Sequence, residues 1–219
     1  MREIINHNLQ CNFNNIKINI NTTNLTIKKS DSNETKITYY NDLKNPLSIK
    51  TEDNTLVIEK GKRKWFTFLY PCFKKNILTI SLPNIPLNIL DIKSNTGKID
   101  ISSLSEKLQI FIKLNTGSLS LNNICCRNLD IKNNTGNIIL NNVIVENDLH
   151  IKSNTGSIKI EQSDAEEISI KSNTGNICGN LLSKRAFVVR CKTGKVTLPD
   201  AFGNKKCEIT TNTGKISFK

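Results

Sequence analysis

A short polar corner, Ser-Asn-Thr-Gly at 94–97, returns with small changes through the rest of the chain and constrains its fold more than any other feature. The residue before the glycine is threonine in all seven copies, and the residue before that is asparagine in six, with Lys192 the exception. Successive copies lie 19 or 20 residues apart, and a fixed period of this length is typical of a repeat architecture. The repeat glycines are Gly97, Gly117, Gly136, Gly156, Gly175, Gly194 and Gly214.

Apolar and polar residues alternate on both sides of each corner. Positions five and seven before the glycine, and two and four after it, are apolar in nearly every copy, as in Leu129, Ile131, Ile138 and Leu140. Alternation with period two predicts a short, half-buried strand on each side of the corner, with both strands facing one core. The residue seven after the glycine is also mostly apolar, which predicts a third short wall with one inward residue per copy.

Two architectures fit two strands per repeat. One is a meander of hairpins with Asn-Thr-Gly as the turn, and the other is a β-solenoid in which each copy is one coil. We favour an all-β, parallel β-helix or β-solenoid with about seven coils of 19–20 residues. Equivalent residues then stack about 4.8 Å apart, so that asparagines can form hydrogen-bonded ladders, which explains why the corner repeats. Seven coils would make a rod of about 34 Å at that rise.

We expect a single domain over 1–219, with regular coils over 81–219 and a divergent N-terminal cap over 1–80. Apolar residues alternate between Ile16 and Ile27, and the pair 47–49 and 56–58 resembles a coil with a different corner at 51–55. Terminal repeats are expected to be atypical because they cover the open end. The chain stops at Lys219, shortly after the last corner, which predicts either an exposed edge or an end-to-end homodimer.

The stretch ILTISLPNIPLNILDIKSNTGKIDI (77–101), with Leu82-Pro83 and the repeated coils after it, resembles the bacterial putative-adhesin domain of unknown function. The resemblance covers about 75–219 well and 1–74 weakly. It implies a β-helix-like solenoid, and the word adhesin describes this architecture rather than an activity. Our leading hypothesis for the function is a non-enzymatic, adhesin-like scaffold or interaction module of uncharacterised ligand. Many members carry a signal or a membrane anchor, whereas this chain shows neither in its sequence.

A column of cations stands four residues before the repeat glycines and points outward by parity. In a solenoid it forms a stripe that could bind a polyanion, such as anionic lipid or acidic glycan. Neighbouring charges at about 4.8 Å would repel by about 0.9 kcal/mol in bulk water. The alternative is a solubilising wall that Asp91, Asp130 and Glu208 partly neutralise. The stripe consists of Lys93, Lys113, Lys132, Lys152, Lys171 and Arg190.

The segment 60–75 combines basic flanks with an aromatic centre. This composition suits a membrane interface, so the segment is a second candidate contact for a membrane or a partner. The alternatives are an aromatic plug over the first coil and a hairpin extension of the N-terminal sheet. The candidate contact residues are Lys62, Arg63, Lys64, Trp65, Phe66 and Phe68.

The net charge of +12 and the pI near 9.4 favour nucleic acid, anionic lipid or acidic partners. The cationic stripe lacks the interleaved aromatics of a single-strand platform, which disfavours nucleic acid. Residues 1–6 do not begin a secretion signal. The sequence has no stretch of about 20 apolar residues that would suit a membrane-spanning helix. The seven cysteines are odd in number and scattered. We therefore expect reduced thiols and a cytoplasmic location, with peripheral membrane attachment as an alternative.

Catalysis finds little support in the residues. His7 and His150 are the only histidines and lie far apart, and no nucleophile elbow, phosphate loop or metal-spaced Cys/His cluster appears. We expect no catalytic residue, no metal and no cofactor. A carbohydrate-active β-helix enzyme remains a third hypothesis, and it would require acids clustered on one wall.

Overall fold

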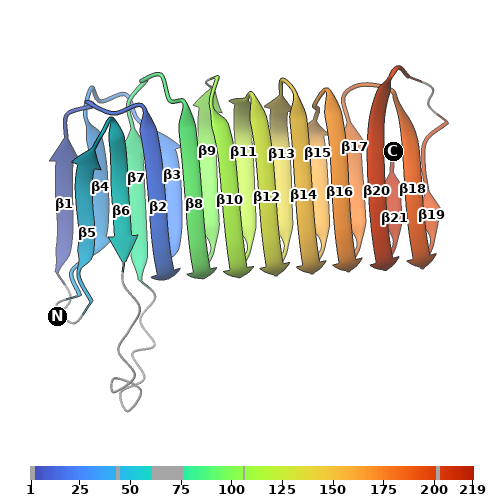
Figure 1. Ribbon diagram of the computed structural model, residues 1–219, viewed down its shortest axis with the longest axis horizontal. Coiled ribbons are helices and arrows are strands. Elements are labelled where there is room, and N and C mark those ends of the chain that lie inside the picture. Colours follow the sequence, from blue (N-terminus) through green and yellow to red (C-terminus); the bar gives the residue numbers. More distant parts are fainter. Residues whose placement is uncertain (1–2, 43–44, 61–75, 106, 201–202) are drawn as a thin grey trace, which may run out of the picture.

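The computed structural model describes residues 3–42, 45–60, 76–105, 107–200 and 203–219. Within these ranges the regular elements are β-strands in two sheets that face each other along an elongated molecule (Figure 1). The described residues contain no helix long and apolar enough to span a membrane. Sheet A runs in spatial order through β1 (Ile4–Leu9), β4 (Thr35–Tyr40), β7 (Ile77–Leu82), β3 (Asn24–Lys29), β9 (Ile99–Ser105), β11 (Leu119–Cys126), β13 (Ile138–Val145), β15 (Ile158–Ser163), β17 (Ile177–Leu181), β21 (Ile216–Phe218) and β19 (Val196–Thr197). Sheet B runs from the opposite end through β18 (Arg185–Thr193), β20 (Lys205–Thr213), β16 (Glu167–Thr174), β14 (Asp148–Thr155), β12 (Asn128–Thr135), β10 (Gln109–Thr116), β8 (Ile89–Thr96), β2 (Asn15–Thr22), β6 (Thr55–Lys60) and β5 (Leu47–Glu52).

Each repeat corner, called an NTG corner below, joins one strand of sheet B to one strand of sheet A. Neighbouring repeats pair in parallel with equivalent residues aligned, so that Ile112 of β10 lies between Ile92 of β8 and Ile131 of β12. Hairpins would pair these strands antiparallel. The prediction of an all-β, parallel, solenoid-like fold is therefore confirmed, and the hairpin meander is wrong for the repeats.

The predicted inward columns form one continuous aliphatic core between the sheets. Leu90, Ile131 and Ile170 of sheet B are fully buried, as are Ile99 and Leu140 of sheet A. Burying one such side chain contributes about 1.5–3 kcal/mol. The core therefore depends on all repeats together, because no single repeat can enclose its own apolar face.

The predicted third wall is not a separate sheet. Leu104, Ile124 and Val143, seven after their glycines, are buried, but they belong to the same sheet A strands as the residues two and four after glycine. Residues with positive φ precede them, for example Asn123 with φ 54° and Asn142 with φ 54°. The residue with positive φ shifts the inward–outward alternation of the side chains by one position, so the residue seven after the glycine also faces the core.

The glycine of the NTG corner is required by stacking as well as by its conformation. Gly136 has φ +127°, and a Cβ at this position would overlap the carbonyl oxygen of Gly117 in the neighbouring corner. The same overlap recurs along the stack, down to Gly97 against the carbonyl of Thr23. The corner formed by β2 and β3 has Thr23 in place of glycine, and Thr23 is not among the described residues with positive φ.

The N-terminal part combines parallel and antiparallel pairs. Strand β6 pairs in parallel with β2, and β7 pairs in parallel with β3, whereas β4 pairs antiparallel with both β7 and β1. Strands β2 and β3 continue the parallel stack beside β8 and β9, as the alternation of 16–27 predicted. The interpretation of 47–58 as a coil is wrong, because β5 and β6 pair antiparallel within sheet B. Asp53 and Asn54 between them have φ 45° and 61°, and positive φ at both central residues is typical of a two-residue hairpin turn.

The expectation that the last repeat ends the solenoid is also wrong. Strand β20 inserts between β16 and β18, and β21 inserts between β17 and β19, so the repeat at Gly194 forms the end of both sheets. In Figure 1 the C-terminus accordingly lies inward from β18 and β19. The inward side chains Phe187 and Val189 of β18 are only half-buried, because no further described strand follows β18 in sheet B.

Candidate functional site

The predicted cationic stripe exists on the outer face of sheet B. Lys93, Lys113, Lys132, Lys152 and Lys171 occupy consecutive strands and face one another directly in the register. The stripe does not continue into Arg190, since the inserted strand β20 places Thr210 between Lys171 and Arg190. The structure thus brings five of the six predicted residues together, and we call these five the lysine row.

The lysine row is only partly neutralised. Lys93 forms a salt bridge with Asp91 at 3.5 Å, and Lys132 forms one with Asp130 at 3.4 Å. Asp91 and Asp130 each stand two residues before their lysine, whereas β10 has Phe111 two residues before Lys113. Within the described ranges Lys113, Lys152 and Lys171 have no salt bridge.

Beyond the lysine row, one acid lies beside the cations of the last strands. The hydrogen bond from Lys206 lowers the pKa of Glu208, and the nearby charges of Lys171 and Arg190 lower it further. Glu208 therefore partly compensates Lys171, and the charges of the lysine row without a described acidic partner lie over β10 and β14.

A ladder of asparagine side chains runs beside the lysine row, as predicted. Each amide donates from Nδ2 to the Oδ1 of the preceding member, with Asn115 donating to Asn95 at 2.8 Å and Asn134 donating to Asn115 at 3.1 Å. The last member, Asn212, donates to Asn173. The single exception in this column, Lys192, lies on the end strand β18. The asparagine ladder consists of Asn21, Asn95, Asn115, Asn134, Asn154, Asn173 and Asn212.

Replacing Asn134 by alanine is expected to lower the free energy of unfolding by about 1–2 kcal/mol, because two hydrogen bonds of about 1 kcal/mol each are lost. Asn134 donates to Asn115 and accepts from Asn154. The matched control is Asn141→Ala, an exposed asparagine of β13 outside the ladder, which should change stability by less than about 0.5 kcal/mol. Urea unfolding followed by circular dichroism measures both; equal effects would show that the ladder adds no stability.

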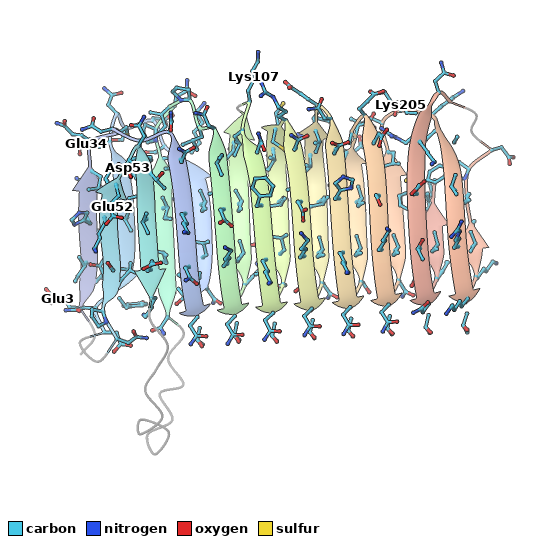
Figure 2. All side chains as sticks on the ribbon, in the orientation of Figure 1. Glu3, Glu34, Glu52, Asp53, Lys107 and Lys205 are labelled. Atoms are coloured by element: carbon cyan, nitrogen blue, oxygen red, sulfur yellow. The ribbon has the colours of Figure 1, made fainter. Side chains whose placement is uncertain are left out.

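The lysine row and the asparagine ladder belong to a larger surface at the NTG corners. We call this surface the NTG edge and define it by residues 93–98, 113–118, 132–137, 152–157, 171–176, 190–195 and 210–215. These segments contain ten Lys or Arg residues and no Asp or Glu, and all ten cations are exposed. Exposed threonines of the corners also face one another on neighbouring strands, as Thr116 of β10 does with Thr135 of β12. Figure 2 shows the regular row of side chains at the lower ends of the sheet B strands.

The opposite edge of the solenoid carries both signs of charge. Glu146, Asp148 and Glu167 lie there, together with the cations Lys107 and Lys205 that Figure 2 labels. Lys205 forms a salt bridge with Glu166 at 2.9 Å. The contrast between the edges shows that the positive charge of the NTG edge is a local property rather than an average of the whole surface.

Other candidate residues do not assemble into a site. The acids Asp91 and Asp130 are separated by Phe111 in their row, and in the described part of the chain no three His, Cys, Asp or Glu side chains could hold a metal ion. The six described cysteines are free thiols, and burial raises the pKa of Cys126 and of Cys207 to about 12. The aromatic-basic candidates at 62–68 lie outside the described residues.

Comparison with known proteins agrees with this geometry. The family model Toastrack DUF4097 matches residues 13–219, almost the whole chain. The chain belongs to the Toastrack DUF4097 family. The resemblance to a bacterial adhesin-type domain of unknown function is thereby confirmed. No functionally curated protein is significantly similar to this Toastrack chain.

One solved structure shows the same fold with a TM-score above 0.5, and two others are similar at lower scores. A "putative adhesin" from Bacteroides fragilis superposes on the Toastrack chain with a TM-score of 0.58 at 20% identity, covering 99% of this chain and 97% of that one. A "putative cell adhesion protein" from Clostridium sporogenes has a TM-score of 0.42 at 14% identity and covers 100% and 99%. A "Putative lipid binding protein" from Parabacteroides distasonis has a TM-score of 0.42 at 11% identity and covers 99% and 96%. At these identities the likeness shows the fold alone.

Proposed function

We propose that this Toastrack chain is a non-enzymatic, adhesin-like binding module whose NTG edge attaches to a linear, hydroxyl-rich polyanion, namely an acidic glycan. One observation carries the proposal: ten exposed cations lie along one edge whose segments contain no acid, and five of them face one another in register. Among the described residues, salt bridges to the flanking Asp91, Asp100 and Asp130 engage only three of the ten. Strands about 4.8 Å apart present the same donors to each successive unit of a polymer. A row of lysines in high dielectric binds weakly one by one, so the affinity comes from many contacts made together.

The composition of the NTG edge favours a glycan over the other polyanions. Its seven segments contain no aromatic residue on which bases could stack. The exposed large apolar side chains, such as Phe111 and Ile139, lie outside these segments, so the edge offers no group for insertion into a bilayer. It offers amides and hydroxyls instead, which are the groups that hydrogen-bond to sugars.

Reversing Lys113, Lys132 and Lys152 to glutamate is expected to lower the affinity for polygalacturonate at least about tenfold at about 50 mM salt and to flatten its salt dependence. All three side chains are exposed on sheet B, so the fold tolerates the change. Retention on a polygalacturonate resin along a salt gradient measures the effect, with a neutral dextran resin to report nonspecific adsorption.

The matched control reverses Lys28, Lys36 and Lys219, which are exposed outside the NTG edge and change the net charge equally; Lys28 and Lys36 lie on sheet A, and Lys219 follows β21. This variant should keep most of the affinity. Equal losses in both variants would mean that binding follows net charge rather than the NTG edge. Binding to phosphatidylglycerol vesicles without binding to polygalacturonate would replace the glycan with a membrane.

A further inference from the structure

One groove interrupts the otherwise regular NTG edge. It has a volume of about 780 Å³ and lies where β2, β6, β8, β10 and β12 are neighbours in sheet B. Its volume falls within the roughly 300–1,000 Å³ of small-molecule sites. Among its described lining residues are three lysines, five asparagines and Ser94, but no acid and no aromatic residue; Ile20 and Leu114 are the apolar members.

The charges of the groove converge on a small volume. Lys93 and Lys113 reach it from the lysine row, and Lys60 joins them from the end of β6. The side chains of the lysine row are exposed, whereas Lys60 is 9% exposed. An anion in the groove would therefore meet the exposed ammonium groups of Lys93 and Lys113 first.

The polar atoms of the groove match hydroxyl groups. Asn95 and Asn115 each use one N–H and one Oδ1 lone pair within the asparagine ladder. One N–H and one lone pair remain on each amide, which allows a ligand hydroxyl to accept and donate at the same side chain. The hydroxyl of Ser94, which is 6% exposed, also lines the groove and has no hydrogen-bond partner.

We propose that this groove is a specificity site for one anionic sugar unit, whose carboxylate or phosphate meets Lys93 and Lys113 and whose hydroxyls meet the amides and Ser94. The inference rests on the proposed function and deepens it. The lysine row attracts the polymer electrostatically along its length, and the groove recognises a single sugar unit. A nucleobase would lack a stacking partner there, and two aliphatic side chains are too few to hold an acyl chain.

The test titrates trigalacturonate into the ¹⁵N-labelled full chain. We expect the side-chain amide signals of Asn95 and Asn115 to shift, and the double variant Lys93→Gln/Lys113→Gln to weaken this binding about tenfold. The matched control is Lys152→Gln/Lys171→Gln, which removes the same charge from the same row outside the groove. The control should stay within about twofold for trigalacturonate, and both variants should lose retention on polygalacturonate resin to a similar degree.

Separate outcomes test the two proposals. Equal weakening of trigalacturonate binding by both double variants would overturn the groove as a site, while loss of resin retention in both would still support the lysine row. Binding of inorganic phosphate or neutral maltotriose as tight as that of trigalacturonate would overturn the anionic sugar. A wild-type chain that resin fails to retain would overturn the proposed function. Trigalacturonate binding by Ser94→Ala and by Ser153→Ala provides a second matched comparison. The Ser153 hydroxyl is equally unpartnered but is not among the described groove-lining residues.

Discussion

Replacing Gly156 by alanine is expected to cost about 3–5 kcal/mol of unfolding free energy, combining a strained backbone with an overpacked contact. Gly156 has φ +137°, a conformation that side chains with a Cβ rarely adopt, and a Cβ there would overlap the carbonyl oxygen of Gly136. The clash is with backbone, so no rotamer change can relieve it. The amide N–H of Gly156 also donates to the Thr174 carbonyl at 2.9 Å, and a shift of the corner would weaken that bond.

Urea unfolding compares this variant with Ser157→Ala, the next residue in the same corner. Ser157 donates its backbone N–H to Asn137 at 3.0 Å, and an alanine keeps that bond. The control should therefore lie within about 0.5 kcal/mol of the wild type. A Gly156→Ala chain as stable as the control would show that the corners do not stack as tightly as described, and the explanation of the repeated glycine would be wrong.

The sequence predicted the features that repeat, because each repetition is an independent observation of the same local physics. Inward columns, the asparagine ladder and the direction of the lysine row all follow from alternation and a fixed period. The shift of alternation at Asn123 and Asn142 was misread as a third wall, since asparagine, which favours positive φ, also stands in six of the seven corners and so does not single out these positions. The hairpin at Asp53 and Asn54 was missed although its turn residues favour positive φ.

The order of the last two repeats could not be predicted from the columns. Strands β18 and β20 carry the same pattern, and either fits in parallel register beside β16. Two departures from the repeat pattern mark β18 as the end strand. Lys192 replaces the ladder asparagine on the strand that has no further described neighbour, and Arg185 introduces a charge at the start of the same strand. The groove was missed because Lys60 comes from outside the repeats, and only the fold brings it to the NTG edge.

Arg185 fixes the exchanged strands in place. Its side chain is fully buried, and Nη1 donates to the carbonyls of Glu166 and Lys206, each at 3.2 Å. Nη2 donates to the carboxylate of Asp164 and to the carbonyl of Ala165. Arg185 thus connects the end strand β18 to the segment before β16, across the inserted strand β20.

Arg185→Met is expected to cost about 3–5 kcal/mol, because it removes the cation beside the half-buried Asp164 carboxylate and leaves the carbonyls of Ala165, Glu166 and Lys206 without this donor. Arg127→Met is the matched control, since Arg127 stands at the same distance before its glycine but is exposed and lies 3.8 Å from Glu146. An exposed pair contributes at most about 1 kcal/mol. Hydrogen exchange should show faster opening of β18 and β20 in Arg185→Met, with β12 unchanged.

The acid dependence of stability provides an independent test of the same cluster. Burial alone raises the pKa of Asp164, but hydrogen bonds from Arg185 and Ser183 outweigh it and hold that pKa below its usual range. Ionised Asp164 therefore stabilises the fold fully above its unfolded pKa of about 3.9, and this contribution is lost as the pH falls through the lower folded value. The stability difference between wild type and Asp164→Asn should be constant from about pH 7 to 5 and shrink below about pH 4. A stability difference that instead grew on acidification would contradict the conclusion that the Arg185–Asp164 pair holds the end strand in place.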